Sequence, residues 1–305
     1  MKMKAKSDLQ MNRIKSGTNA LFNLVFVVLA AAAILPVVFV FMISISSEES
    51  IRQVGYSFFP VEFSSKAYLF LWNERGTIFN ALLISVLVTC LGMALGILLT
   101  TTMGYSLSRP EFKLKQFYTW VIFIPMLFSG GLVASYVVNA NILGLRNSLW
   151  VLILPLAVSS YNIVICKTFF KSTIPDGIIE SAKIDGATQL RTFVSIVVPI
   201  SKPLFATIAL FLCFGYWNDW FLSSLYISNS KLVSLQALLN NIMRSLEYMA
   251  NNPTAGVSLQ QYKAQMPSES VRMAIAIVIV IPIACAYPFF QKYFISGLTI
   301  GAVKG

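Results

Sequence analysis

Apolar runs separated by polar segments extend over almost the whole chain of 305 residues. A helix needs about 20 apolar residues to cross the hydrocarbon core of a bilayer, and six of the runs are long enough. The pattern therefore predicts an all-α membrane protein with six transmembrane helices. The helices are expected at about 21–45, 78–107, 117–138, 149–169, 193–214 and 271–290.

The first apolar run follows a basic stretch, residues 1–18, and so has the order of a secretory signal peptide. The run is too long for a signal core, however, and no small-residue cleavage site follows it. We expect a basic cytoplasmic N-terminal tail at 1–18 and a six-helix domain at 19–305 whose first span is retained.

Glycine and proline residues indicate where helices bend or approach one another. Gly92 and Gly96 lie in the second span, where small residues admit close contact between helices. Pro125 and the pair Gly130 and Gly131 lie in the third span. They predict a bend or a broken turn near its outer half.

Composition and charge fix the class and the orientation. The chain is 57% hydrophobic and only 11% charged, against roughly 25% charged in an average soluble domain. With the N-terminus in the cytoplasm, the inner segments hold 15 Lys and Arg and 5 Asp and Glu, whereas the outer segments hold 8 and 7. This distribution follows the positive-inside rule and places both termini in the cytoplasm. It accounts for the net charge of +11 without a nucleic-acid partner.

The residues that usually carry metal or nucleotide chemistry are missing or unsuitably placed. The chain has no histidine and no Gly-x-x-x-x-Gly-Lys-Ser/Thr phosphate loop. Its four cysteines fall inside apolar runs without paired spacing. They are Cys90, Cys166, Cys213 and Cys285. We therefore expect no metal site, no cofactor in this chain and no enzymatic activity of its own.

A long polar stretch, 172–203, lies on the predicted cytoplasmic side between the fourth and fifth spans. Pro175 suits a first helical turn, and Asp176 and Glu180 place negative charge near the positive end of that helix. Apolar residues at spacings of three and four predict one narrow stripe on a helix. The stripe consists of Ile179, Ala182, Gly186, Leu190 and Phe193. Because glycine weakens a helix by about 1 kcal/mol, Gly186 indicates that another surface approaches the backbone; an ordinary connector is the alternative.

The centre of this stretch resembles a known motif. The segment Glu180-Ser181-Ala182-Lys183-Ile184-Asp185-Gly186-Ala187, followed by Phe193, Ile196, Pro199 and Pro203, is similar to the EAA loop of binding-protein-dependent ATP-binding-cassette import permeases. Ser181 replaces the first alanine of the family pattern, which exchanges one small residue for another. The resemblance covers about 75–297 and implies the MetI-like fold of type I importers.

Three further segments resemble the carbohydrate branch of that family. They are Ser129-Gly130-Gly131-Leu132, Asn147-Ser148-Leu149-Trp150 and Trp217-Asn218-Asp219-Trp220. Within this branch the chain is similar to the smaller, maltose-type second permease subunit, in a Gram-positive group that imports complex oligosaccharides.

The resemblance implies a coupling helix at about 174–191 that docks on a separate ATPase subunit, where ATP and Mg are held. The implied coupling residues are Glu180, Ser181, Ala182, Asp185, Gly186 and Ala187, with an apolar contact face of Ile179, Ala182 and Leu190. The implied partners are a second permease subunit, two ATPases, an extracellular solute-binding protein, membrane lipid and a carbohydrate substrate. The implied location is the cytoplasmic membrane of a bacterium.

A sugar that crosses a membrane needs hydrogen-bonding side chains and aromatic faces along its path. The candidate path residues are Asn80, Tyr161, Asn162, Tyr216, Trp217, Asn218 and Asp219. Each has a structural alternative, because polar residues bridge helices and aromatic residues form interfacial belts. The excursion 221–270 is expected to face the binding protein through Arg244, Glu247 and Lys263, or to be a solvated loop.

Other functions are compatible with a polytopic membrane protein. An ion-coupled secondary transporter needs ionisable residues near the membrane centre, and an embedded enzyme needs paired carboxylates or a nucleophile. Neither pattern is evident in the sequence. An importer of a non-sugar solute and a scaffold remain further alternatives.

Overall fold

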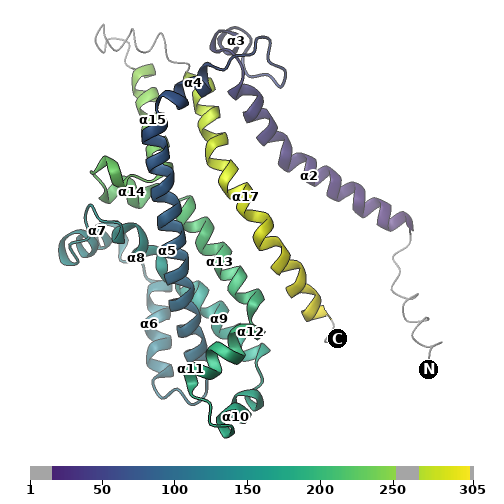
Figure 1. Cartoon of the computed structure of the whole chain (residues 1–305), viewed down its shortest axis with the longest axis vertical. Helices are drawn as coiled ribbons and strands as arrows, with labels where there is room; N and C mark the ends of the chain where they lie inside the picture. The colour runs from purple at the N-terminus through teal and green to yellow at the C-terminus, as the bar shows by residue number, and fades with distance from the viewer. Residues whose placement is uncertain (1–15, 252–267, 303–305) are drawn as a thin grey trace. The chain divides into compact units, whose positions relative to one another are not determined.

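The computed structural model describes residues 16–251 and 268–302, which fall into two compact units. The first unit holds 16–72 and 268–278, and the second holds 73–251 and 279–302. The described residues are mainly helical and form no β-strand; one isolated bridge joins Ser46 to Phe63 (Figure 1). The predicted all-α class is therefore confirmed.

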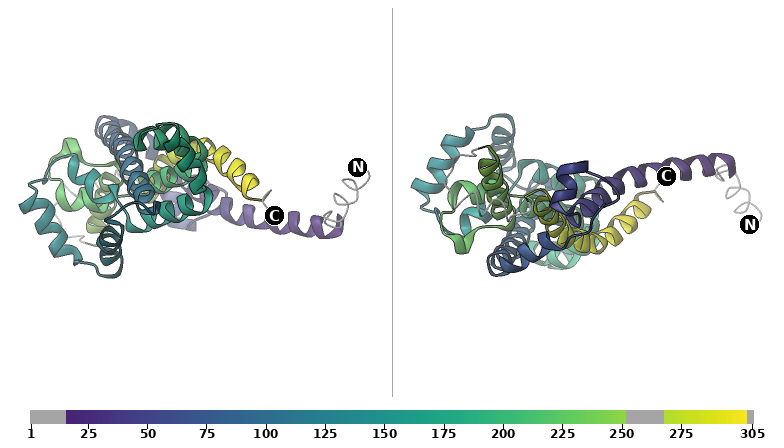
Figure 2. Two further views of the ribbon diagram at one scale, coloured as in Figure 1. Left: turned by 90° about the horizontal axis from the view of Figure 1, so that it is seen from below. Right: turned by 90° about the horizontal axis from the view of Figure 1, so that it is seen from above.

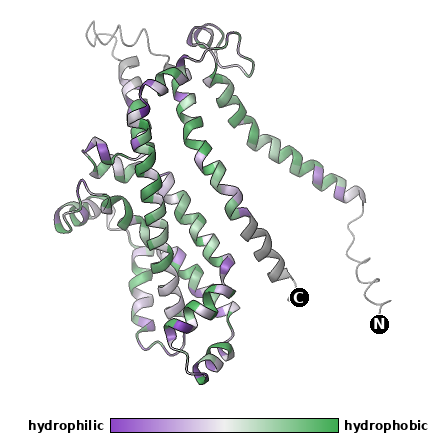
Figure 3. Cartoon of the chain, viewed as in Figure 1, coloured by the Kyte–Doolittle hydropathy of each residue, from purple (hydrophilic) through white to green (hydrophobic). Residues whose placement is uncertain are grey.

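The first unit consists of three helices and the start of a fourth. They are α2 (Ser16–Ser44), α3 (Glu48–Val54), α4 (Lys66–Asn73) and the first residues of α17 (Ser268–Ala302). Most of α2 is exposed, and apolar residues run along it (Figure 3). This is the composition of a helix whose solvent is lipid.

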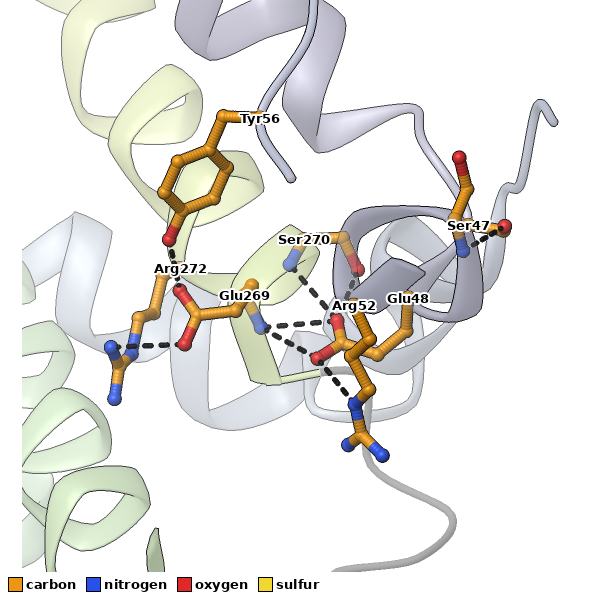
Figure 4. A network of polar contacts seen from close by, with 8 residues as sticks. Ser47, Glu48, Arg52, Tyr56, Glu269, Ser270 and Arg272 are labelled. Atoms are coloured by element: carbon orange, nitrogen blue, oxygen red, sulfur yellow. Dashed lines mark hydrogen bonds and ion pairs between the residues drawn. The ribbon is translucent and has the colours of Figure 1, made fainter. Parts of the chain in front are cut away.

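Glu48 joins α3 to the first turn of α17 within this unit (Figure 4). Its carboxylate accepts hydrogen bonds from the backbone N–H groups of Glu269 at 3.1 Å and Ser270 at 3.3 Å. A carboxylate in this position complements the positive end of the helix. Glu269 in turn accepts from the Tyr56 hydroxyl at 2.8 Å and pairs with Arg272 at 3.3 Å. The hydrogen bond to Glu269, together with burial, raises the pKa of Tyr56 above its usual value.

The second unit is built around α5. Its elements are α5 (Arg75–Ser108), α6 (Lys115–Leu127), α7 (Gly131–Tyr136), the π-helix η1 (Val137–Ile142), α8 (Trp150–Ala157), α9 (Ser160–Thr173), α10 (Asp176–Ile184), α11 (Gln189–Thr192), the π-helix η2 (Phe193–Val197), α12 (Val198–Ile200), α13 (Lys202–Trp217), α14 (Phe221–Tyr226), the 3-10 helix η3 (Ser230–Leu232), α15 (Leu235–Asn251) and the rest of α17. The helices α8, α9 and α13 pack against α5 (Figure 1, Figure 2).

Glycine residues make this packing close. A Cβ atom at Gly96 would lie 2.8 Å from the carbonyl oxygen of Ala157, and a Cβ at Gly92 would collide with the ring of Tyr216. At Gly104 it would collide with the Cβ of Cys166. The predicted close contacts at Gly92 and Gly96 are therefore confirmed, since no larger side chain fits.

Three helices among the described residues are long and apolar enough to cross a membrane: α2, α5 and the Glu269–Gln291 part of α17. The number is five if each of two bent helix pairs is one broken span. They are α8 with α9, bent by 46°, and Gln189–Ile200 with Lys202–Trp217, bent by 85°. The third predicted span is divided into shorter helices, because α6 ends at Leu127 and α7 begins at Gly131. The predicted break at Gly130 and Gly131 is confirmed.

The predicted fifth span, 193–214, is wrong at its beginning. Phe193 belongs to the segment before the 85° bend, and the straight helix begins at Lys202. Pro203 explains the bend, because it has no N–H to donate to the carbonyl of Pro199 one turn earlier. The segment from Gln189 to Ile200 therefore leaves the direction of α13.

Candidate functional site

The centre of the polar stretch 172–203 folds as two short helices, α10 and α11, at one end of the second unit (Figure 1). The predicted continuous stripe through 193 is wrong, because α10 ends at Ile184. The N–H of Gly186 donates to the carbonyl of Lys183 at 3.1 Å, and the N–H of Ala187 donates to that of Ala182 at 2.9 Å. This pair of bonds is a Schellman motif.

Gly186 supplies the backbone conformation that the motif needs. Its φ is +77°, a region that residues with a Cβ enter at a cost. Apart from the residues directly next to it, a Cβ placed there would meet no atom of the described part of the chain within 4 Å. The glycine is thus explained by the end of α10, rather than by the close approach of another surface of this chain.

The faces of α10 and α11 also differ from the predicted contact face. Ala182 is buried, and the half-buried Ile179 packs on the chain's own apolar core. Two other apolar side chains are turned outward: Ile184 is 86% exposed and Leu190 is 73% exposed. Ile184 and Leu190 are therefore the most exposed apolar side chains of this end, ahead of Val194 and Ile178.

The predicted coupling residues lie around this outward surface. Glu180, Ser181, Asp185 and Gly186 are exposed, and Ala187 is half-buried. The Ser181 hydroxyl donates to the carbonyl of Gly177 at 2.9 Å, as a mid-helix serine commonly does. Ala182 is the member that faces the core.

Arg109, which follows α5, joins three helix ends to one another. Its Nη1 donates to the Asp176 carboxylate at 3.1 Å and its Nη2 to the carbonyl of Phe170 at 3.2 Å. Its Nε donates to the Ser108 hydroxyl at 3.0 Å, and the guanidinium carbon lies 5.3 Å from the centroid of the Tyr105 ring. We call these five residues the Arg109 junction.

A second ion pair, at the surface, connects the turn between α5 and α6 to α10. Lys183 in α10 lies 2.9 Å from the carboxylate of Glu111, and both side chains are about 60% exposed. Between the two segments lies a hollow of about 490 Å³. Its lining includes Tyr105, Arg109 and Glu180. The α5–α6 turn and the α10–α11 segment are thus held together by charge around a partly open space.

Arg109 and Glu111 were not among the residues that the sequence pattern indicated. The signal that was present is an arginine directly before a proline, at the end of a long apolar run. The residue before proline is disfavoured in the helical region, so α5 ends at Ser108 and Arg109 takes an extended conformation. The partner Asp176 lies 67 positions further along the chain.

Two of the predicted substrate-path residues use their polar atoms inside the helix packing. Tyr216 is buried and donates its hydroxyl to the carbonyl of Ile153 at 2.7 Å. Trp217 is also buried, and its indole N–H donates to the carbonyl of Ile279 at 3.3 Å. Both therefore connect helices.

The other path candidates are spread over the second unit. Asn80 donates to the carbonyl of Lys231 at 2.9 Å, and the exposed Asn218 donates to that of Phe214 at 3.0 Å. Tyr161 is 58% exposed, whereas Asn162 beside it is buried. Burial raises the pKa of Asp219, although backbone N–H groups of the next helix oppose the rise.

The residues predicted to face a binding protein are described in part. Arg244 lies over the ring of Trp220, with 5.5 Å between the guanidinium carbon and the ring centroid. Glu247 on the same helix is exposed. Lys263 lies outside the described residues.

Comparison with known proteins assigns these features to a family. The family profile described as "Binding-protein-dependent transport system inner membrane component" matches residues 92–300. Protein LplC of Bacillus subtilis (strain 168) is 35% identical over 275 residues, which cover 90% of each chain. The polygalacturonan/rhamnogalacturonan transport system permease protein YtcP of the same organism is 35% identical over 291 residues, 94% of this chain and 99% of that one.

A solved structure has the same fold. It is the crystal structure of a bacterial ABC transporter involved in the import of the acidic polysaccharide alginate. One of its chains superposes with a TM-score of 0.77 and 25% sequence identity, over 93% of this chain and 100% of that one.

Proposed function

Because the chain belongs to the family of binding-protein-dependent transport system inner membrane components, we propose that it is the permease subunit of an ATP-driven importer of oligosaccharides. The observation that carries this proposal is the similarity to YtcP, a permease named for polygalacturonan and rhamnogalacturonan, over nearly the full length of both chains. The likeness to a chain of an alginate importer supports the same class of substrate.

The proposed topology has six spans with both termini in the cytoplasm of a bacterial cell. Three long helices are three spans, and we count each bent pair as one broken span, which gives five. The sixth is formed by α6 and α7, on either side of the break at Gly130 and Gly131. The excess of Lys and Arg in the inner segments supports this orientation.

The proposed energy source is a pair of ATPase subunits that hold ATP and Mg. Ile184 and Leu190 present exposed apolar side chains at the α10–α11 end, and Glu180 and Asp185 add exposed carboxylates beside them. An apolar centre with a charged rim is the usual composition of a protein–protein contact. A second permease subunit and an extracellular solute-binding protein complete the proposed complex.

Transport of purified components tests the proposal. The chain is reconstituted in proteoliposomes with its partner permease, ATPase and binding protein, and uptake is measured with neutral oligosaccharides and with uronate oligosaccharides. We expect uptake of an oligosaccharide that needs both ATP and the binding protein. Uptake driven by an ion gradient without ATP would support the ion-coupled alternative, and uptake confined to a non-sugar solute would contradict the proposed substrate.

A further inference from the structure

Arg109 occupies a place where three helix ends meet. α5 ends at Ser108, the carbonyl of Phe170 lies in the last turn of α9, and Asp176 is the first residue of α10. A cation is favoured near the carboxyl end of a helix and an anion near the amino end. Both charges of the Arg109–Asp176 pair are therefore favourably placed, because Arg109 lies at the carboxyl end of α9 and Asp176 at the amino end of α10.

The burial of Arg109 distinguishes this contact from an ion pair between two exposed side chains, although the Asp176 side chain itself is 67% exposed. Arg109 is only 8% exposed, and its guanidinium has hydrogen bonds to three residues. A buried guanidinium requires such partners, because an unpartnered buried charge is strongly unfavourable. The rigid fork of an arginine serves three separate acceptors at once, which the point charge of a lysine does not.

The connection of α10 to the rest of the unit passes through few other polar contacts. The Lys183–Glu111 pair joins the same segments, but both of its side chains are exposed to water, where ion pairs contribute little. Asp176, in contrast, meets a cation that is itself fixed to α5 and α9. Arg109 is therefore placed to make the three helices one rigid body.

We infer that Arg109 is a positioning residue for energy coupling, which makes α10 move together with α5 and α9. This inference rests on the proposed function, in which an ATPase displaces α10. Displacement of α10 then moves α5 and α9 directly, because Asp176, Phe170 and Ser108 all hold the same guanidinium. Without the junction, α10 is held to α5 and α9 only by its apolar packing and the short connection after Thr173, and the two helices follow its displacement incompletely.

Two conservative substitutions test the inference in the assembled transporter. Arg109→Lys keeps the positive charge but loses the three-way fork, and Asp176→Asn keeps the shape but removes the anion. We expect transport to fall by about tenfold relative to ATP hydrolysis, within the roughly 5- to 150-fold range typical of coupling between sites. Glu111→Gln, which breaks the exposed pair between the same segments, is the matched control and should leave the ratio of ATP hydrolysed to sugar transported unchanged.

The measured quantities separate coupling from folding. Each variant is compared at equal amounts of assembled complex, determined by co-purification of the ATPase. If transport and ATP hydrolysis fall together, or if both variants keep the wild-type ratio, the inference is wrong. If the wild-type chain neither retains an ATPase nor transports sugar with ATP, the proposed function itself fails.

A distance measurement tests the rigid body without reference to transport. Spin labels are placed at Ser181 on α10 and at Leu98, an exposed residue of α5, after the four native cysteines are replaced. We expect one narrow distance in the wild-type complex, both without nucleotide and with ATP. In Asp176→Asn the distribution should broaden or shift with ATP; an unaltered distribution contradicts the inference.

Discussion

The ring of Tyr216 lies directly against the backbone of Gly92, so closely that a Cβ atom on that glycine would overlap the ring. The contact joins α13 to α5. The Tyr216 hydroxyl then reaches the carbonyl of Ile153 in α8 at 2.7 Å. One side chain thus brings together three helices of the second unit, and it does so because α5 has a glycine at this position.

Gly92→Ala should destabilise the packing of α13 on α5. Overpacking a close contact costs about 1–3 kcal/mol, because the ring or a helix must shift. Thermal unfolding of the purified chain in detergent, followed by size-exclusion chromatography, measures the effect as a lower midpoint. Gly76→Ala in the same helix is the control, since a Cβ there meets no atom within 4 Å. An equal loss in both variants would show that the Tyr216 contact is not the cause.

Tyr216→Phe should lower stability while it leaves sugar transport nearly intact. The ring keeps its place against Gly92, but the carbonyl of Ile153 in α8 loses one of its donors, at a cost of about 0.5–1.5 kcal/mol for a single hydrogen bond. Transport kinetics per assembled complex, measured beside the unfolding midpoint, separate the two roles of the residue. A large rise in the KM for the sugar at unchanged stability would support the substrate path instead.

Several features of the fold were predictable because they depend on local sequence. The runs of apolar residues predicted the all-α class and the long helices α2, α5 and α17, and the pair Gly130 and Gly131 predicted the break between α6 and α7. Gly92 and Gly96 predicted close packing, since small residues in a span have few other uses. The helices and the break have causes within a few residues of their effects. Gly92 instead meets Tyr216, far along the chain, and only its small size made a close contact predictable.

Other features depend on information that a periodic pattern does not contain. Gly186 falls on the spacing of an apolar stripe, but its φ of +77° ends the helix there. Periodicity describes which face a residue is on and says nothing about backbone handedness. Arg109 was missed for a different reason. Its carboxylate partner, Asp176, lies 67 positions further along the chain, and a local pattern does not predict a contact between residues that far apart. The coupling and substrate-path roles remain predictions.

Substitutions at Gly186 should follow backbone preference rather than size. A residue with a Cβ costs about 1–2 kcal/mol in the left-handed region, and asparagine tolerates that region better than alanine. We therefore expect Gly186→Asn to retain more ATPase binding and transport than Gly186→Ala. Co-purification of the ATPase and ATP-dependent uptake, compared at equal expression, measure the order.

A reversed order of the two Gly186 variants would lead to a different conclusion. If Gly186→Asn is worse than Gly186→Ala, size matters more than φ, and the ATPase must approach the backbone at this glycine. Since the described residues, apart from the two chain neighbours, place no atom within 4 Å of such a Cβ, this result would indicate crowding by the partner.

Leu190→Glu should weaken ATPase binding without destabilising the chain. Leu190 is 73% exposed, so its replacement leaves the chain's own packing almost unchanged. If the ATPase covers Leu190, the substitution removes about 1.5–3 kcal/mol of apolar burial and adds a desolvated charge. The dissociation constant for the purified ATPase should then rise by at least tenfold. Titration of labelled ATPase against the chain in detergent measures it.

Leu190→Met is the matched control for this prediction. Methionine keeps the apolar character and nearly the volume of leucine, so the dissociation constant should remain within a few-fold of the wild-type value. The unfolding midpoints of both variants should equal that of the wild type, because an exposed side chain contributes little to folding. Normal ATPase binding by Leu190→Glu would place the ATPase contact elsewhere than on the exposed face of α11. A lower midpoint in Leu190→Glu would instead show that Leu190 supports the fold, and the loss of binding would then be indirect.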